Sequence, residues 1–410
     1  MRIALLTMHS CPLEQAGTQD TGGMNVYAMD IAKQLGLHNH QVDIFTLAHD
    51  LKEDSVIQLS PRIRLIHTNL NSIGVPKKQL INHITSYESE IEDFRRDQQI
   101  RYDIVHSHYW LSGKAGINLS AQWDAPHVSS FHTTAALKNA AWSENQEIPE
   151  RSETERQIAL EADRIITWTA QESGDLQKLY QSQKTNFSII PIGVNRDIFY
   201  PHKKSKAREH FKINPEEEII LYLGRLDPIK GANVFIDIAH KLKHRKNLRS
   251  FIVGGEANGL TQKNLALLTK DLNISERVTF LNPISHGDLP VLYSAVDMLV
   301  VPSYYESFSM VTAESMASGT PVIASNVSGP ASLIADGKTG FLVAPGDGNE
   351  FARRIEIFLD EPSLRKKMIL RLPNSIAHLE WSLISEKIIK VYLEELEIRQ
   401  KLKTKNLLTT

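Results

Sequence analysis

Two pairs of charged residues lie where a strand-like run passes into a helical pattern in the second half of the chain. Arg225 and Lys230 belong to LGRLDPIKG, and Glu306 and Glu314 belong to YYESFSMVTAE. Cations beside a helix N-terminus could neutralise a diphosphate, and carboxylates could accept hydrogen bonds from sugar hydroxyl groups. Spacing alone leaves the ordinary alternatives open, namely two solvated surface cations, one capping acid and one surface acid.

A pair of glycines in the first loop is a further candidate phosphate site. Gly22 and Gly23 follow the first apolar run and open a helical stretch, so backbone amides there could approach an anion closely. No third glycine completes the GxGxxG pattern, which argues against a nicotinamide-dependent oxidoreductase. The alternative is that Asp20 or Thr21 caps the helix and the glycines only form the turn.

The composition is that of an ordinary globular protein. Its 410 residues suggest two domains, and 46 basic against 48 acidic residues give no reason to expect nucleic acid or an anionic membrane as a partner. The single cysteine, Cys11, excludes an internal disulfide. MRIALLTMHS indicates a first strand rather than a signal peptide, so we expect a cytoplasmic protein without a transmembrane segment.

Short β-branched runs alternate with amphipathic stretches, which is typical of doubly wound α/β domains with parallel sheets. Two Rossmann-like domains are predicted, 1–195 and 196–384, joined by a polar, non-periodic stretch near 195–215. The amphipathic helix at 385–402 is expected to pack back on the first domain. Helices are predicted in the first half at 23–36, 77–97, 111–121, 151–162 and 171–181. Strands are predicted at 2–8, 41–47, 62–68, 102–108, 126–132, 164–170, 187–193, 218–226, 249–255, 277–282, 297–303, 321–325 and 340–345.

The order of these motifs resembles the retaining GT-B glycosyltransferases of family 4. GRLDPIKG and PSYYESFSMVTAESMASGTPVIAS resemble the donor-site signature of that family, and IIPIGVNRDIF and DGKTGFLVAPGD extend the resemblance over the whole chain. It implies that Arg225 and Lys230 bind a nucleotide diphosphate, that Glu306 contacts the transferred sugar and that Glu314 holds the ribose. Backbone amides of Phe308, Ser309 and Met310 would assist, with Ser309 standing where the family usually has glycine.

The first half has a narrower resemblance. PLEQAGTQDTGGMNVY, VHSHYWLSG and SSFHTTAALKN resemble the inositol-phosphate N-acetylglucosaminyltransferases of mycothiol synthesis and, next to them, the sucrose-phosphate synthases. This implies that Asn25 touches the acceptor ring and that His132 lies beside the donor sugar, with catalysis shared by His132, Arg225, Lys230 and Glu306. The resemblance gives the acceptor phosphate to Lys78, Tyr109, Thr133 and Arg151.

Several of these assignments have alternatives. Arg156 is on the same predicted helix as Arg151 and could take its place, and Lys78 could be a plain surface lysine. His106 and His108 at a strand end have a structural interpretation, and Tyr109 and Trp110 could simply pack between sheet and helix.

The predicted reaction is the transfer of a sugar from UDP-GlcNAc or UDP-Glc to a small phosphorylated acceptor, with retention and without a cofactor or divalent metal. Fructose 6-phosphate is the alternative to inositol phosphate as acceptor. The rivals are a sugar-nucleotide epimerase of the same fold and an exported sugar-binding protein. The sequence leaves open whether the chain forms a homodimer.

Overall fold

The computed structural model describes the whole chain except residues 14–21, 51, 69–71, 145, 181–185, 256–258 and 410. It divides into two compact units. The first joins the N-terminal strand and Gly23–Pro191 with Trp381–Thr410, and the second is Ile192–Glu380. Each unit is an α/β structure around one largely parallel sheet, as the alternating pattern predicted.

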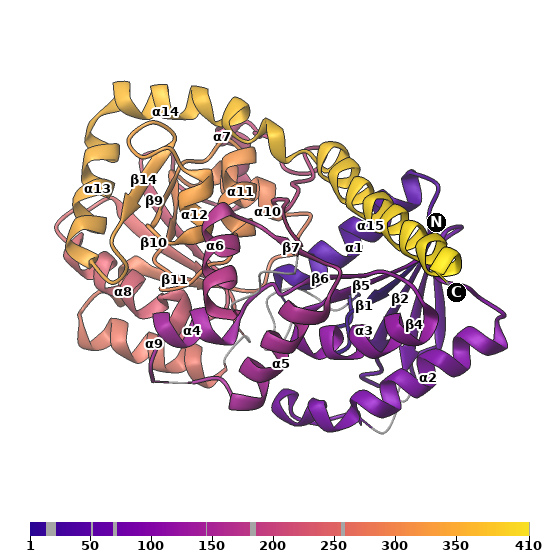
Figure 1. Cartoon of the computed structure of the whole chain (residues 1–410). Helices are drawn as coiled ribbons and strands as arrows, with labels where there is room; N and C mark the ends of the chain where they lie inside the picture. The colour runs from indigo at the N-terminus through magenta and orange to yellow at the C-terminus, as the bar shows by residue number, and fades with distance from the viewer. Residues whose placement is uncertain are drawn as a thin grey trace. The chain divides into compact units, whose positions relative to one another are not determined.

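The first unit contains an eight-stranded sheet in the order β3-β4-β2-β1-β5-β6-β7-β8 (Figure 1). All its pairings are parallel except that of β3 with β4. The sequence did not predict β3, because this short edge strand is largely exposed and has no continuous apolar run. The strands are β1 (Arg2–Leu6), β2 (Gln41–Leu47), β3 (Val56–Ser60), β4 (Ile63–Thr68), β5 (Ile104–His108), β6 (His127–Ser130), β7 (Arg164–Thr167) and β8 (Asn186–Ile189).

The helices of the first unit follow the predicted ones closely, with two corrections. The single helix predicted at 77–97 is a 3-10 helix, η2 (Lys77–His83), followed by α2 (Ile84–Asp97), and the short helix at Ala135–Ala141 was not predicted. The other helices are α1 (Gly23–Leu37), α3 (Tyr109–Trp123), α4 (Ala135–Ala141), α5 (Pro149–Glu161), α6 (Ala170–Tyr180) and α15 (Trp381–Thr409).

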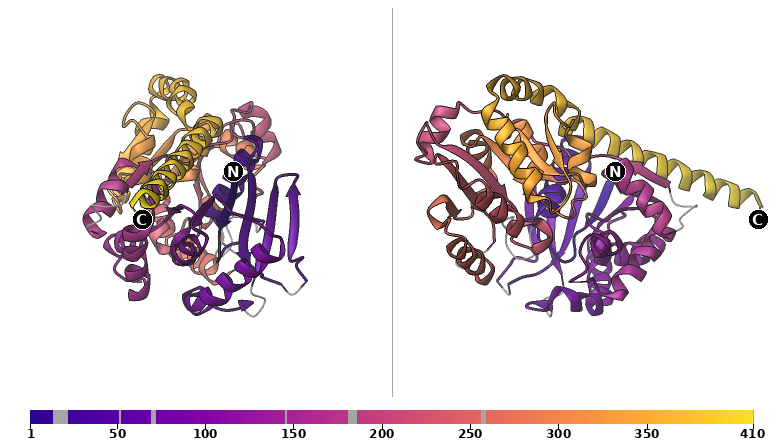
Figure 2. Two further views of the ribbon diagram at one scale, coloured as in Figure 1. Left: turned by 45° about the vertical axis from the view of Figure 1, so that its right-hand side comes forward. Right: turned by 90° about the vertical axis from the view of Figure 1, so that its left-hand side faces the viewer.

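The last helix, α15, is the long yellow helix that ends at the C-terminus (Figures 1 and 2). It is bonded to the sheet of the first unit at two places. The Tyr392 hydroxyl lies 2.6 Å from Nδ1 of His106 on β5, and Arg164 of β7 donates to Glu395 at 2.7 Å. The C-terminal segment is therefore part of the first unit although the second unit precedes it in the chain.

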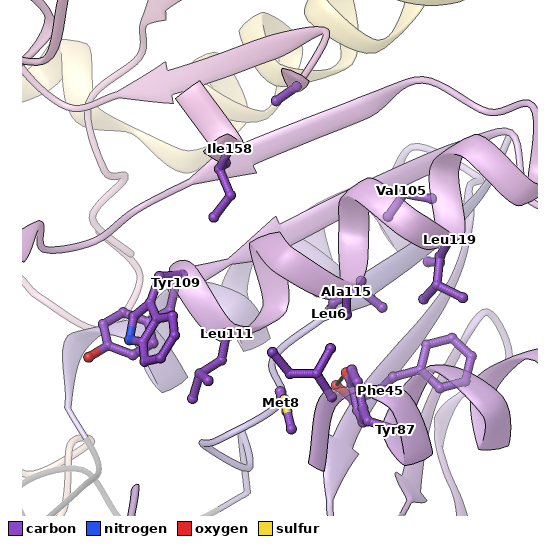
Figure 3. Close-up of a cluster of buried hydrophobic side chains, with 14 of the residues drawn as sticks. Leu6, Met8, Phe45, Tyr87, Val105, Tyr109, Leu111, Ala115, Leu119 and Ile158 are labelled. Carbon is purple, nitrogen blue, oxygen red and sulfur yellow. Dashed lines mark hydrogen bonds between the residues drawn. The ribbon is translucent and has the colours of Figure 1, made fainter. Parts of the chain in front are cut away.

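The core of the first unit is built around α3. Ile158 of α5 lies on one side of this helix, and Leu6, Met8 and Phe45 lie on the other (Figure 3). At Gly113 the approach of α5 is so close that a Cβ would lie 2.5 Å from Cδ1 of Ile158. Glycine there lets the two helices pack in contact.

The second unit contains a six-stranded parallel sheet in the order β11-β10-β9-β12-β13-β14. The predicted non-periodic stretch 195–215 is not entirely irregular, because α7 (Lys204–His210) forms within it and buries Arg208 against Asp297 and backbone carbonyls. The strands are β9 (Glu218–Leu223), β10 (Leu248–Val253), β11 (Val278–Leu281), β12 (Met298–Val301), β13 (Val322–Ser325) and β14 (Gly340–Val343).

The remaining elements of this unit connect those strands. They are η3 (Pro228–Lys230), α8 (Ala232–Lys241), α9 (Leu260–Asp271), η4 (Ser275–Arg277), α10 (Leu289–Ala295), α11 (Met310–Ala317), α12 (Ser328–Leu333), α13 (Gly348–Asp360), α14 (Pro362–Ser375) and η5 (Ala377–Leu379). In each unit the candidate residues follow strands that are neighbours in the sheet: β5 and β6 in the first, and β9 and β12 in the second. Parallel neighbours end at the same edge, where α/β proteins bind ligands.

Candidate functional site

In the second unit, the loops after β9 and β12 are pressed together. Gly231, just after η3, has φ +75°, and a Cβ there would lie 2.2 Å from the carbonyl oxygen of Pro302. The amide of Tyr304 donates to the carbonyl of Ile229 at 2.8 Å. Only glycine allows this approach at a left-handed backbone position. The contact brings Lys230 and Glu306, far apart in sequence, to the same place.

Lys230 and Glu306 form an ion pair, with 2.9 Å between Nζ and Oε1. Ser303 also donates to Oε1 of Glu306 at 2.9 Å. Arg225 lies on the same loop as Lys230, two residues beyond the end of β9, and its guanidinium is 3.7 Å from Asp227. The Arg225 side chain is 36% exposed, so a ligand can reach it from solvent.

The segment between β12 and α11 holds Phe308, Ser309 and Met310. Phe308 is buried, and Gly329 packs against its backbone so closely that a Cβ would lie 2.2 Å from the Phe308 carbonyl oxygen. Met310 is the first residue of α11, and Ser309 precedes it with φ +78°. A non-glycine residue in this region is strained, and such strain gathers at functional sites.

Glu314 is held by a different set of partners from Glu306. It lies one turn into α11, buried, with Oε1 2.9 Å from Nε2 of His286 and Oε2 accepting from the Tyr293 hydroxyl at 3.1 Å. Burial, and then the charge of Glu314, raise the pKa of Tyr293 well above its ordinary value, so its hydroxyl remains a donor. His286 and Tyr293 were not predicted, because nothing in their spacing relates them to Glu314.

In the first unit, Arg151 contacts two of the other predicted acceptor residues, Tyr109 and Thr133. It is 2% exposed, and its Nη1 donates to the Tyr109 hydroxyl at 2.9 Å. Its Nη2 donates to the carbonyl and the hydroxyl of Thr133 at 2.7 and 3.0 Å. Two carboxylates complete the cluster: Glu155 at 2.7 Å from Nε and Glu147 at 3.1 Å from Nη1. Arg156 points elsewhere, since it is half exposed and paired with Glu153.

The predicted lysine is not the one that reaches this cluster. Lys78 is exposed on η2, whereas Nζ of the preceding residue, Lys77, lies 4.5 Å from the centre of the Tyr109 ring. The ring of His9, after β1, lies 4.3 Å from the same tyrosine ring. Burial, and then the charges of Lys77 and Arg151, lower the pKa of His9 well below its ordinary value. Lys77 was not predicted, because adjacent lysines differ only in the helix face that they occupy.

His132 and Tyr109 have unusual backbone conformations. The φ angle of His132 is +61° and that of Tyr109 is +74°. Tyr109 directly follows the end of β5, and His132 lies two residues beyond the end of the adjacent strand β6. Nε2 of His132 lies 3.0 Å from Nδ1 of His108, and burial lowers the pKa of His132 to about 3. The His132 imidazole is therefore neutral at physiological pH.

The first loop contains the remaining predicted residues. Asn25 is buried and bonded within the loop: its amide donates to the Cys11 carbonyl at 2.6 Å and accepts from the Ser10 hydroxyl. Gly23 begins α1, and the space where a Cβ of Gly22 would lie is open within 4 Å. The alternative caps Asp20 and Thr21 lie outside the described residues.

Two kinds of feature, a metal cluster and a membrane-spanning helix, are absent from the described part of the chain. No group of three or more His, Cys, Asp or Glu side chains there is arranged to hold a metal ion. No helix there is both long and apolar enough to cross a bilayer.

Comparison with known families matches both halves of the chain. Residues 21–198 match the family described as Glycosyltransferase Family 4, and residues 203–372 match Glycosyl transferases group 1. The D-inositol 3-phosphate glycosyltransferase of Corynebacterium aurimucosum is 34% identical, with 97% of each chain covered. That of Nocardia farcinica is 36% identical over 95% of this chain and 89% of the relative.

Two solved structures are similar to this chain over nearly its whole length. The sucrose-phosphate synthase of Thermosynechococcus elongatus aligns with a TM-score of 0.90 and 30% identity, covering 96% of this chain and 98% of that one. Anabaena Alr3699/HepE in complex with UDP-glucose has a TM-score of 0.74 and 19% identity, over 96% of this chain and all of that one. The second likeness concerns the fold alone.

Proposed function

This chain belongs to the family 4 glycosyltransferases, retaining enzymes of GT-B fold, and from that membership we propose that it transfers a sugar from a UDP-sugar to a hydroxyl group of inositol phosphate. The observation that carries the acceptor is the buried cluster of Arg151, Tyr109 and Thr133, with Lys77 beside it. Guanidinium, ammonium and hydroxyl groups that converge in this way suit a phosphate. Lys77 takes the role that the sequence had given to Lys78.

The donor is assigned to the second unit. Arg225 and Lys230 would bind the diphosphate, and Glu306 would accept hydrogen bonds from the transferred sugar. Support comes from their convergence after β9 and β12 and from the 2.9 Å contact between Lys230 and Glu306. Glu314 would hold the ribose, with His286 and Tyr293 fixing its carboxylate. The two ribose hydroxyls would then donate hydrogen bonds to a carboxylate that is already held in the right orientation.

The chemistry proposed for these residues is displacement on one face of the sugar. The acceptor oxygen bonds to the anomeric carbon as the bond from that carbon to the diphosphate oxygen breaks, and the departing diphosphate takes the hydroxyl proton. Arg225 and Lys230 stabilise the charge that develops on the leaving group. Neutral His132 can exchange a hydrogen bond with the sugar without adding charge. These cations supply the neutralisation, so we expect activity without a divalent metal.

The relatives support inositol phosphate as the acceptor more strongly than they support fructose 6-phosphate. Chains of 34% and 36% identity are named D-inositol 3-phosphate glycosyltransferases and are matched over nearly their full length. A second candidate is transfer to fructose 6-phosphate, which the TM-score of 0.90 to a sucrose-phosphate synthase favours. Both acceptors carry a phosphate, so the Arg151 cluster is consistent with either.

A matrix of substrates tests the proposal. UDP-GlcNAc, UDP-Glc and a GDP-sugar would each be offered with inositol phosphate, with fructose 6-phosphate, with free sugars and with no acceptor, after exhaustive chelation. We expect release of UDP that depends on inositol phosphate. Conversion of the nucleotide sugar without an acceptor would indicate an epimerase, and release only with fructose 6-phosphate would replace the proposed acceptor.

A further inference from the structure

All three nitrogens of the Arg151 guanidinium have partners. Nε donates to Glu155, Nη1 to Tyr109, and Nη2 to the carbonyl and the hydroxyl of Thr133. Glu147 adds an ion pair, with its Oε2 3.1 Å from Nη1. Because the Arg151 side chain is also only 2% exposed, a phosphate can bind the guanidinium directly only if one of these partners leaves.

Glu147 is the partner that can leave at least cost. Glu155 is fully buried and also accepts from the Ala135 amide and the Tyr180 hydroxyl, so its departure would strand two buried donors. Tyr109 is the first residue of α3, directly after β5, and Thr133 lies in the connection between β6 and α4. Glu147 lies in the connection between α4 and α5, and its side chain is 17% exposed. It thus has a route to water.

The charges around Arg151 also indicate that Glu147 is the partner that leaves. Arg151 faces two carboxylates, and a phosphate dianion added beside both would place a large negative charge around one guanidinium. Although burial raises the pKa of Glu147, the charge of Arg151 and the hydrogen bond from Lys138 outweigh it and bring that pKa below its ordinary value. Glu147 is therefore ionised at neutral pH and competes as an anion.

We propose that Glu147 occupies the anion position of Arg151 when no acceptor is bound, and that it sets acceptor affinity by competing with the acceptor's phosphate. The inference rests on the proposed function, since it takes the phosphate to bind at Arg151. Exchange of one anion for another keeps the cluster neutralised throughout. A neutral acceptor cannot make this exchange, so Glu147 would also act as a filter for phosphorylated acceptors.

The test is calorimetric titration of the full chain with inositol phosphate. Glu147→Gln keeps the shape of the side chain but removes the competing charge, so the Kd for inositol phosphate should fall by about tenfold. The matched control is Glu153→Gln, which removes an exposed acid from α5 that pairs with Arg156. That control should leave the Kd unchanged, and neither variant should alter the Kd for UDP.

A second variant is needed because the amide introduced by Glu147→Gln could still accept a hydrogen bond from Arg151. Glu147→Ala removes the side chain entirely and should also tighten inositol phosphate. Weaker or equal binding in both variants, where the parent prefers inositol phosphate to inositol, would overturn the inference alone and make Glu147 a structural support. If the parent itself does not distinguish inositol phosphate from inositol, the proposed function and the inference fail together.

Discussion

The two units each present an arginine beside acids, but the two arginines are in opposite states. Arg151 of the first unit is 2% exposed and has partners at all three of its nitrogens. Arg225 of the second unit is 36% exposed and 3.7 Å from its carboxylate neighbour. An exposed cation can accept a ligand by simple addition, whereas a saturated one must exchange. The first unit therefore depends on its arginine for stability, and the second has its arginine available for binding.

The largest effect that we expect is a loss of stability at acid pH. The first unit buries five histidines whose pKa values burial lowers, to about 3 for three of them: His9, His106, His108, His127 and His132. Below pH 6.5 the unfolded chain binds protons that the native chain cannot, so stability falls as pH drops. Each histidine contributes up to about 1.4 kcal/mol per pH unit.

Urea unfolding at pH 7.5 and at pH 5.5 measures this effect. The free energy of unfolding should drop by several kcal/mol at the lower pH, with each histidine adding up to about 1.4 kcal/mol. His127→Gln should reduce the proton uptake on unfolding by about one, and His244→Gln, at an exposed position, serves as the control. Equal stability at the two pH values would mean that the buried histidines titrate normally.

Removing each arginine should separate stability from binding. Arg151→Ala leaves the buried carboxylate of Glu155 without its cation, which should lower the free energy of unfolding by about 3–5 kcal/mol. Arg225→Ala should change it by no more than about 0.5 kcal/mol while weakening UDP about tenfold or more. Urea titration and UDP calorimetry on the same two variants provide the measurements. Similar stability losses in both variants would mean that the two arginines do not differ in their contribution to stability.

Within the second unit, the two glutamates should have different effects. Glu314→Ala removes the proposed ribose contact and should weaken UDP by about 10- to 150-fold, the factor for roughly 1.5–3 kcal/mol. Glu306→Ala should mainly slow transfer of the sugar. Calorimetry with UDP and turnover at saturating donor separate these effects. If both variants bind UDP like the parent, the ribose assignment is wrong.

The smallest expected effect is at Ser309. Its φ of +78° is strained for a side chain with a Cβ, so Ser309→Gly should stabilise the protein by roughly 1 kcal/mol. Gly319, at the other end of α11, has φ +80°, and Gly319→Ala should destabilise it by a similar amount. Thermal unfolding of the pair checks the sign. A lower Tm for Ser309→Gly would show that the serine hydroxyl, which lies 2.8 Å from that of Thr312, outweighs the strain.

The sequence predicted the fold and the family well because both depend on local, repeated signals. Alternation of apolar runs and helical patterns predicted the parallel strands, and the strand-end motifs predicted the glycosyltransferase. The edge strand β3 and the short helices α4 and α7 were missed because each is too short to show an apolar periodicity of its own.

The geometry of the site was harder to predict. Arg151 and Arg156 are both on α5, and only the packing of that helix decides that Arg151 is buried and Arg156 is not. Lys77 and Lys78 differ by one step around η2, which residue types cannot resolve. The positive φ angles of Tyr109 and His132 were not predicted, because residues with a Cβ rarely adopt them. The bonds from Arg151 to Tyr109 and Thr133 likewise appear only once α5 is packed against the ends of β5 and β6.

The central claim is that the Arg151 cluster recognises the phosphate of the acceptor. Its most direct test is the ratio of kcat/KM for inositol phosphate to kcat/KM for free inositol, measured with one UDP-sugar. Free inositol cannot form the charge-assisted hydrogen bonds that a phosphate would make to Arg151 and Lys77, which are worth about 1.5–3 kcal/mol each, so we predict a ratio of about 100 or more. A ratio near one would contradict the account, because the buried arginine, tyrosine and threonine would then have no part in selecting the acceptor.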